Sequence, residues 1–244
     1  MTRDTIAPDA GSGASAGAPI IGILGWEAAG NTEIYGSLAA PGTFAFPVIY
    51  KHVEGACYDT IIANPSPSVL ARMIDAVREM EDAGIKAITT SCGFNSIFQK
   101  ELADAAHVPV FTSALLLVPL IHRMLGSSRS VGVISADSAH LTARHLSAAG
   151  IASSMPVRVC GLEHSATFTA VCTSAMPQRV DIERLRTDVV EVARRVVAEA
   201  GDVGAIVLEM TILHAFSDDI SRAVNLPVYD IVTLANFVYS GLLK

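Results

Sequence analysis

The sequence has no cluster of basic side chains, and acidic residues outnumber basic ones. Its 17 Lys and Arg against 24 Asp and Glu give a net charge of −7 over 244 residues. Binding to nucleic acid depends on clustered Lys and Arg that neutralise phosphates. We therefore expect no nucleic-acid partner and favour a small anionic or carbonyl substrate.

Long apolar runs are also missing. The longest, residues 114–121, contains Pro119 and is far below the roughly 18 residues that a membrane span needs. The first 18 residues carry Asp4 and Asp9 and have no apolar core, which excludes a secretory signal. We expect residues 1–18 to be a flexible tail, and the protein to be cytoplasmic with no membrane partner.

Motifs for metals and cofactors are absent as well. The sequence has no zinc-type group of His, Cys and Asp, no Walker motif and no G-x-G-x-x-G. Its four cysteines follow no C-x-x-C spacing; they are Cys57, Cys92, Cys160 and Cys172. We expect free thiols, no metal and no cofactor.

The sequence does contain a regular alternation of strand-like and helix-like segments, in a chain that is 51% hydrophobic. Residues 66–84 and 181–201 show the clearest helical patterns, beginning at the capping residues Ser66 and Asp181. Short apolar runs predict eight strands, at residues 19–25, 46–51, 86–91, 108–112, 130–135, 156–162, 204–209 and 226–230. The alternation predicts an α/β fold with parallel sheets flanked by helices.

An internal repeat gives more information about the architecture. Residues 87–112, "AITTSCGFNSIFQKELADAAHVPVFT", align without a gap with residues 205–230, "AIVLEMTILHAFSDDISRAVNLPVYD". The repeat predicts two related halves, each with a strand-turn-helix unit. We assign residues 19–116 plus 215–244 to the first domain and residues 117–214 to the second.

The repeat places Cys92 opposite Met210. Each residue follows the carboxyl end of a predicted strand, where open α/β sheets bind their ligands. The amides of the following helix can hold an anion there. Two such ends facing each other would hold a small carboxylate from both sides.

Four stretches of the sequence resemble the aspartate/glutamate/hydantoin racemase superfamily, and its hydantoin-racemase-like branch in particular. They are "AITTSCGFNSIFQKELA", "VPVFTSALLLVPLI", "VGVISADSAHLTARHLSAAGI" leading to "VCGLE", and "IVLEMT". The resemblance implies two pseudo-symmetric Rossmann-like α/β domains with the active site in the cleft between them. It also implies cofactor-independent proton transfer next to a carbonyl, performed by two cysteines, one from each domain. It also implies a homo-oligomer, and C₂ dimers are the commonest assembly.

The resemblance identifies Cys92 as the first cysteine and places the second at Met210. Relatives usually have Glu-Cys-Thr where this chain has Glu209-Met210-Thr211. A thioether neither donates nor accepts a proton, so symmetrical racemisation by two thiols is not available.

A second departure lies near the N-terminus. In "YGSLAAPGTFAFPV", Ser37 and Ala40 stand where the hydantoin-racemase-like branch commonly has Asp and Asn. This difference indicates that the substrate or the reaction has changed.

Cys92 itself has two interpretations. A cysteine at the end of an apolar strand is commonly a small hydrophobic residue in the core. A helix that begins near Asn95 would instead favour the thiolate, and the amides of Gly93, Phe94 and Asn95 would hold a carboxylate or an enolate oxygen. The local sequence favours the first interpretation, and the family resemblance favours the second.

The partner of Cys92 is a separate question. His214 follows Met210 by four residues, so on an α-helix the two would share a face and His214 could be a second acid or base. The alternative is a polar residue in the first turn of a helix. The remaining predicted substrate-binding residues are Ser91, Thr211, Ile212 and Trp26, the last at the end of the first strand.

Three functions follow, in order of preference. The first is a cofactor-independent racemase or isomerase that uses Cys92, with His214 as partner, on a small carboxylate, amino acid or hydantoin. The second is a one-cysteine decarboxylase of a malonate-type acid, because the enediolate left by CO₂ needs only one proton donor. The third is a non-catalytic carboxylate-binding protein.

Overall fold

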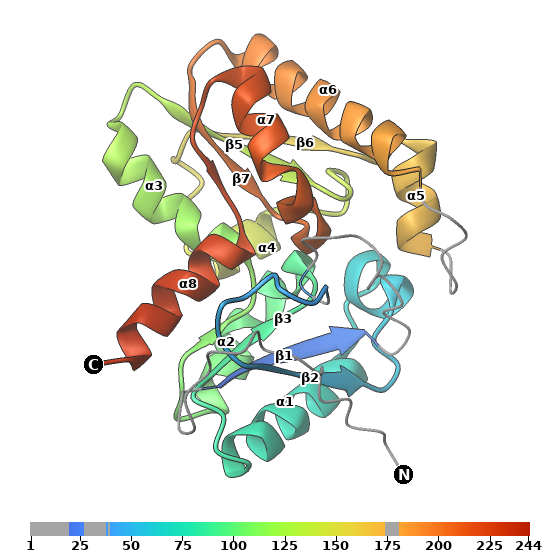
Figure 1. Cartoon of the computed structure of the whole chain (residues 1–244), viewed down its shortest axis with the longest axis vertical. Coiled ribbons are helices and arrows are strands. Elements are labelled where there is room, and N and C mark those ends of the chain that lie inside the picture. Colours follow the sequence, from blue (N-terminus) through green and yellow to red (C-terminus); the bar gives the residue numbers. More distant parts are fainter. Residues whose placement is uncertain (1–19, 27–37, 39, 174–180) are drawn as a thin grey trace.

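The chain folds into two four-stranded parallel sheets, each covered by helices (Figure 1). The computed structural model describes residues 20–26, 38, 40–173 and 181–244, so the predicted tail 1–18 lies outside the described residues. The strand order is β2-β1-β3-β4 in the first sheet and β6-β5-β7-β8 in the second. The predicted α/β class with two related sheets is confirmed.

Each of the eight predicted runs overlaps a strand. The first sheet consists of β1 (Ile21–Trp26), β2 (Val48–Val53), β3 (Ala87–Thr90) and β4 (Val110–Phe111). The second consists of β5 (Ser130–Ser135), β6 (Val157–Gly161), β7 (Val203–Leu208) and β8 (Val228–Tyr229). Strands β3, β5 and β7 are buried throughout, as expected for parallel strands covered on both faces.

Helices connect the strands. The α-helices are α1 (Pro67–Asp82), α2 (Gln99–Asp104), α3 (Val118–Leu125), α4 (Ala143–Ala148), α5 (Ala166–Thr173), α6 (Ile182–Ala200), α7 (Ser217–Val224) and α8 (Ile231–Leu242). Three short 3₁₀ helices are η3 (Gly93–Phe98), η4 (Ala114–Leu117) and η5 (Thr211–Phe216), and η2 (Asp59–Ala63) is a π-helical turn.

The internal repeat is visible in the fold. The series β3, η3, α2, β4 in the first half has the same order as β7, η5, α7, β8 in the second. The start of η3 at Gly93 aligns with the start of η5 at Thr211, in the register of the gapless sequence alignment. The two halves are therefore structural copies from the central strand through the edge strand.

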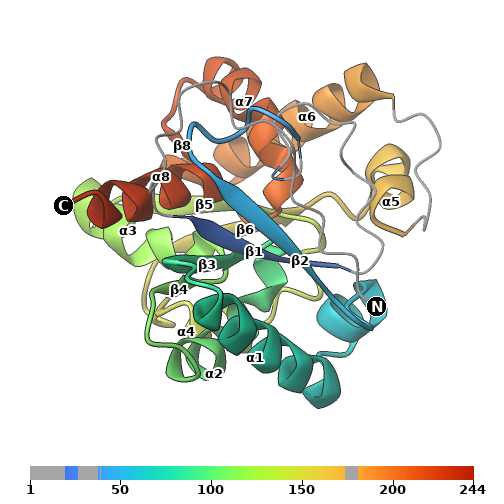
Figure 2. The same cartoon turned by 60° about the horizontal axis from the view of Figure 1, so that its bottom comes forward.

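The predicted domain boundary at residue 215 differs from the strand pairing. Strand β8 pairs with β7, and α7 packs against α6, so residues 217–229 belong with the second sheet. The physical reason is that this segment is the repeat's own helix and edge strand. Helix α8, which follows edge strand β8 of the second sheet, contacts β3 of the first sheet. Helix α3, which follows edge strand β4 of the first sheet, packs on β5 and β7 of the second (Figures 1 and 2).

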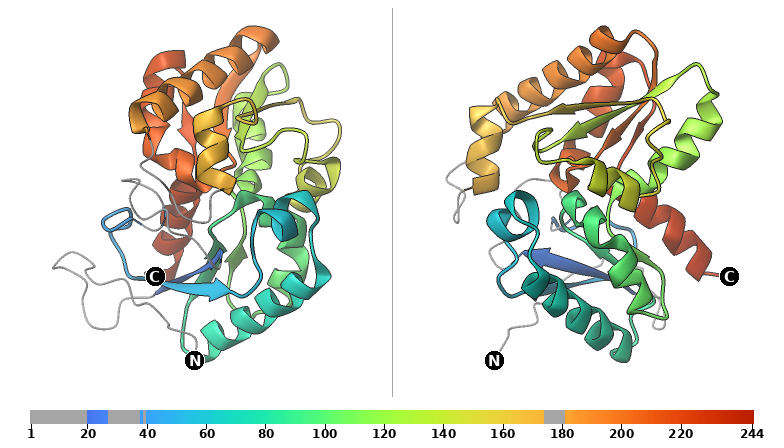
Figure 3. Two further views of the ribbon diagram at one scale, coloured as in Figure 1. Left: turned by 90° about the vertical axis from the view of Figure 1, so that its right-hand side faces the viewer. Right: turned by 180° about the vertical axis from the view of Figure 1, so that it is seen from behind.

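Helix α4 lies between the halves. It follows β5 of the second sheet and packs on η3 of the first, as the rear view in Figure 3 shows. It therefore covers the segment that follows Cys92.

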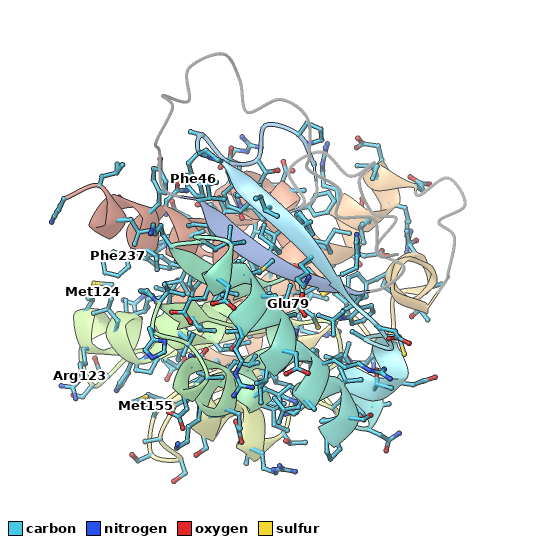
Figure 4. All side chains as sticks on the ribbon, turned by 90° about the horizontal axis from the view of Figure 1, so that it is seen from below. Phe46, Glu79, Arg123, Met124, Met155 and Phe237 are labelled. Carbon is cyan, nitrogen blue, oxygen red and sulfur yellow. The ribbon has the colours of Figure 1, made fainter. Side chains whose placement is uncertain are left out.

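A few large apolar side chains remain exposed on the outside of the molecule. They include Met124 on α3 and Phe237 on α8, which lie toward the same edge of the view in Figure 4. The expected homo-oligomer stays a prediction. No helix in the described ranges has both the length and the apolar character that crossing a membrane requires.

The capping residues of the two long helices offer a matched test of stability. Asp181 accepts a hydrogen bond from the Arg184 amide at the start of α6, whereas the Ser66 side chain makes no such bond at the start of α1. We expect Asp181→Ala to lower the free energy of unfolding by about 1 kcal/mol, and Ser66→Ala to lower it less. Urea unfolding of both variants measures the difference, and equal losses would contradict the assignment of the caps.

Candidate functional site

The carboxyl ends of β3 and β7 meet at the boundary between the two halves. Cys92 and Met210 each follow one of these strands as the residue before a 3₁₀ helix, and both are buried. The residue before each of them is anchored by an equivalent backbone hydrogen bond. The Ser91 amide donates to the Leu24 carbonyl oxygen, and the Glu209 amide donates to the Ile134 carbonyl oxygen. The two strand ends therefore have matching backbone positions in their sheets.

The two strand ends are in direct contact. The Thr211 hydroxyl donates a 2.6 Å hydrogen bond to the Ser91 carbonyl oxygen across the boundary. At the equivalent place on the other side, a methyl group added at Gly93 would collide with both the carbonyl oxygen and Oε1 of Glu209. In the repeat Gly93 corresponds to Thr211, and Ser91 to Glu209, so the contacts obey the pseudo-twofold relation. The structure brings Ser91, Gly93 and Thr211 together around the predicted site.

The short helix after Cys92 differs from the one that the sequence predicts. It begins at Gly93 rather than near Asn95, and it is a 3₁₀ helix. The sequence predicts that the Asn95 amide holds a ligand oxygen. In the structure this amide donates to the Cys92 carbonyl oxygen at 3.1 Å instead. The Oδ1 atom of Asn95 is buried and has no hydrogen-bond partner in the described chain.

The geometry that suggested His214 as the partner of Cys92 does not hold. Because η5 is a 3₁₀ helix with 3.0 residues per turn, a spacing of four residues turns His214 by roughly 120° from Met210. Its Nδ1 lies 2.7 Å from Oδ2 of the buried Asp230, the residue that caps α8. Burial raises the pKa of Asp230, but hydrogen bonds from His214, Ser217 and Thr233 outweigh it and lower the pKa.

Other predicted substrate-binding residues lie on the same strand ends and helices. Trp26 is the last residue of β1, and its indole N–H is buried without a hydrogen-bond partner in the residues described. Phe94 and Ile212 are buried in the first turns of η3 and η5. Phe94 packs edge-on against His145, with ring centroids 5.4 Å apart.

His145 on α4 is a further buried side chain at the boundary between the halves. Helix α4 packs on η3, so the imidazole is enclosed between the halves with 2% of the residue exposed. Burial, with a smaller effect from Arg144, lowers the pKa of His145 to about 4, so the ring is neutral near pH 7. Its Nδ1 lies 2.9 Å from the Thr142 hydroxyl.

Glu209 is the residue that the sequence did not single out. It is fully buried, and Oε2 accepts hydrogen bonds from the Ser135 hydroxyl (2.9 Å) and the Ala136 amide (3.4 Å). Burial raises the pKa of Glu209 to about 7, although these two hydrogen bonds act in the opposite direction. The feature of the sequence that could have identified Glu209 is a single acidic residue at the end of an otherwise apolar strand.

A polar cluster joins the two halves, and it includes the serine that binds Glu209. Tyr58 of the first half donates to Asp137 of the second at 3.2 Å, and His140 Nδ1 lies 2.6 Å from the same carboxylate oxygen. The Ser135 hydroxyl, which binds Glu209, also lies 3.4 Å from the Asp137 carbonyl oxygen. The loop after β5 therefore connects Glu209 to the first half.

Within the described ranges, no disulfide joins Cys57, Cys92 or Cys160. Cys160 lies in β6 and is buried, while the side chain of Cys172 and residue Ser37 lie outside the described part. Within the described ranges, no group of three or more His, Cys, Asp or Glu side chains could hold a metal ion.

Gly93 allows the two strand ends to approach, and its substitution tests the contact. In Gly93→Ala the new methyl group meets a backbone oxygen that cannot rotate away, so the halves must move apart. We expect a loss of about 1–3 kcal/mol in the free energy of unfolding, measured with urea. Gly241→Ala in α8, where nothing lies within 4 Å, is the control and should cost nothing. Equal stability of the two variants would contradict the close approach.

The stability contribution of Glu209 depends on pH. Its pKa rises from 4.5 to about 7 on folding, so the native state binds the proton more tightly. The contribution is complete below pH 4.5 and is lost as pH rises through 7. We expect the free energy of unfolding of the wild type, relative to that of Glu209→Gln, to fall as the pH rises across this window. The fall should be no more than about 3 kcal/mol.

Urea unfolding at a series of pH values measures that difference. Glu163→Gln is the matched control, because burial raises the pKa of Glu163 but hydrogen bonds from Ser138 outweigh it and lower the pKa. Its relative stability should therefore change in the opposite direction, declining as pH falls. A difference for Glu209→Gln that stays constant with pH would refute the buried neutral acid.

Comparison with known proteins gives the family. The model of the Asp/Glu/Hydantoin racemase family matches residues 21–236. A dimethylsulfoniopropionate lyase of Durusdinium sp. clade D is 32% identical over 212 residues, which cover 84% of this chain and 69% of that protein. Dimethylsulfoniopropionate lyase 7 of Emiliania huxleyi (strain CCMP1516) is 26% identical over 222 residues, or 85% of this chain and 63% of that one. The chain spans 45% to 63% of the length of four Emiliania huxleyi relatives.

Solved structures share the fold across the whole chain. Allantoin racemase from Pseudomonas fluorescens has a TM-score of 0.64 at 18% identity, covering 92% of this chain and 90% of that chain. Unliganded arylmalonate decarboxylase has a TM-score of 0.55 at 17% identity, covering 93% of both chains. With the family model matched over residues 21–236, the chain belongs to the Asp/Glu/Hydantoin racemase family.

Proposed function

We propose that the protein is a cofactor-independent lyase that removes the proton next to a carboxylate with Cys92 and expels a leaving group from the neighbouring carbon. The substrate class is a sulfonium-bearing carboxylic acid such as dimethylsulfoniopropionate. The observation that carries the proposal is the single thiol: Cys92 lies at the contact of the two strand ends, and the corresponding position holds Met210. The names of the relatives at 32% and 26% identity support the choice of reaction.

Elimination needs only one proton-transfer group. The proton on the carbon next to the carboxylate goes to the Cys92 thiolate, and its bonding electrons form the carbon–carbon double bond. The carbon–sulfur bond breaks with its electron pair going to sulfur, so dimethyl sulfide leaves as a neutral molecule beside acrylate. Because this leaving group needs no proton, the apolar Met210 is compatible with the reaction.

The charges of the site support a substrate with one carboxylate and one cationic group. Residues 91–96, 135–142 and 209–214 contain no Lys or Arg, whereas Asp137 contributes an acid. A dicarboxylate such as aspartate or glutamate would bring two negative charges to a region without a basic side chain, which is costly when buried. A sulfonium acid has no net charge and avoids that cost.

The racemase that the sequence favoured needs a second proton donor on the Met210 side. His214 is turned away from Met210 around η5 and binds Asp230, so the case for His214 as that second donor is weaker than the sequence suggested. Decarboxylation of a malonate-type acid also needs only one thiol, and it is a competing outcome of the test below. Cytoplasmic localisation and the homo-oligomer remain predictions.

The direct test is release of dimethyl sulfide from dimethylsulfoniopropionate, measured by gas chromatography. We expect turnover by the wild type and a loss of at least about 100-fold in kcat for Cys92→Ser, because the hydroxyl is a far weaker base than the thiolate. Cys57→Ser, which changes an exposed thiol away from the contact, is the control and should keep full activity.

Two competing reactions are measured beside it: racemisation of aspartate, glutamate and allantoin, and release of CO₂ from arylmalonates. Wild-type activity only on one of those substrates would refute the lyase and identify the other reaction. Unchanged activity in Cys92→Ser would refute the role of the thiol.

A further inference from the structure

Glu209 has a free oxygen that points at the contact between the halves. Oε2 is occupied by Ser135 and Ala136, whereas Oε1 is buried and has no hydrogen-bond partner among the described residues. Oε1 lies against Gly93, the residue that follows Cys92. Oε1 therefore lies at the contact of the two strand ends, against the residue next to Cys92 in the chain.

The proton of the neutral acid belongs on the same oxygen. Oε2 accepts two hydrogen bonds, so a protonated Glu209 carries its hydrogen on Oε1 and is a donor without an acceptor. A buried donor left unpaired costs roughly 1–3 kcal/mol. An acceptor supplied by a ligand would remove that cost.

A carboxylate is an acceptor that the protonated Oε1 can bind. With no Lys or Arg in residues 91–96, 135–142 and 209–214, these segments offer a carboxylate only neutral donors. A neutral carboxylic acid kept protonated in an apolar site can donate to an oxyanion in this way. Ionised Glu209 would instead repel the same ligand.

We propose that neutral Glu209 binds the substrate's carboxylate through Oε1 and stabilises the negative charge that develops on it when Cys92 removes the neighbouring proton. The inference rests on the proposed function for the class of substrate. It assigns the second half of the chain a catalytic residue next to Met210, in the place where the sequence suggested His214. It also makes ligand binding depend on the protonation of one acid.

Other titratable groups lie near Glu209, and the Glu209→Gln variant separates its contribution from theirs. Titratable and charged side chains on the surrounding segments are Cys92 before η3, Asp137 and His140 after β5, Arg144 and His145 on α4, His214 on η5 and Asp230 before α8. Asp137 and Asp230 are paired with His140 and His214, and His145 is neutral near pH 7.

The test measures binding of propionate, a carboxylate without a leaving group, by calorimetry on both sides of neutrality. Burial holds the pKa of Glu209 near 7, so we expect the dissociation constant of the wild type to rise roughly tenfold per pH unit above that value. Glu209→Gln places a permanent N–H donor at the same point, so it should bind propionate with little change over the same range.

Glu163→Gln is the matched control and should keep the wild-type pH dependence. Propionate binding by the wild type that is independent of pH, or absent, would overturn the inference, and so would an unchanged pH dependence in Glu209→Gln. If the variant fails to fold, pH-independent binding of propionate by the wild type still overturns the inference. A wild type that binds propionate as expected but releases no dimethyl sulfide would refute the lyase and leave the carboxylate site in place.

Discussion

The contact between residues 91–93 and 209–211 is the constraint on which the rest of the site depends. The Thr211 hydroxyl bonds to the Ser91 carbonyl, and Gly93 leaves room for Glu209. Each strand end is fixed in its own sheet by an equivalent backbone hydrogen bond, so the two ends meet at matching backbone positions. The exchange of α3 and α8 between the halves and the packing of α4 on η3 then enclose the contact.

The backbone of this contact is close to symmetrical, but its side chains are not. Cys92 corresponds to Met210, Gly93 to Thr211 and Ser91 to Glu209. One half therefore contributes a thiol and the other a buried carboxyl group with a pKa near 7. A symmetrical pair of thiols would suit proton removal on one face and proton delivery on the other. The asymmetrical pair suits removal of one proton from a carbon whose carboxylate is held by a neutral acid, which agrees with the lyases among its relatives.

The sequence predicts the architecture better than the chemistry of the site. Apolar runs and the gapless repeat locate all eight strands and place Cys92 opposite Met210, because these features depend on local pattern and on duplication. The sequence pattern after Met210 could not distinguish a 3₁₀ helix from an α-helix. This difference changes the position of His214 around the helix relative to Met210. Nor could it reveal that His145 and Glu209 are enclosed, since their burial arises from packing between the halves rather than from periodicity along one element.

The central claim is that the reaction begins with removal of the proton from the carbon next to the substrate's carboxylate. The most direct measurement is the rate of dimethyl sulfide release from substrate deuterated at that carbon, compared with substrate deuterated at the carbon that bears sulfur. The account predicts a primary isotope effect for deuterium next to the carboxylate and none for deuterium next to sulfur. Equal rates for the two labelled substrates, or an effect only at the sulfur-bearing carbon, would contradict it.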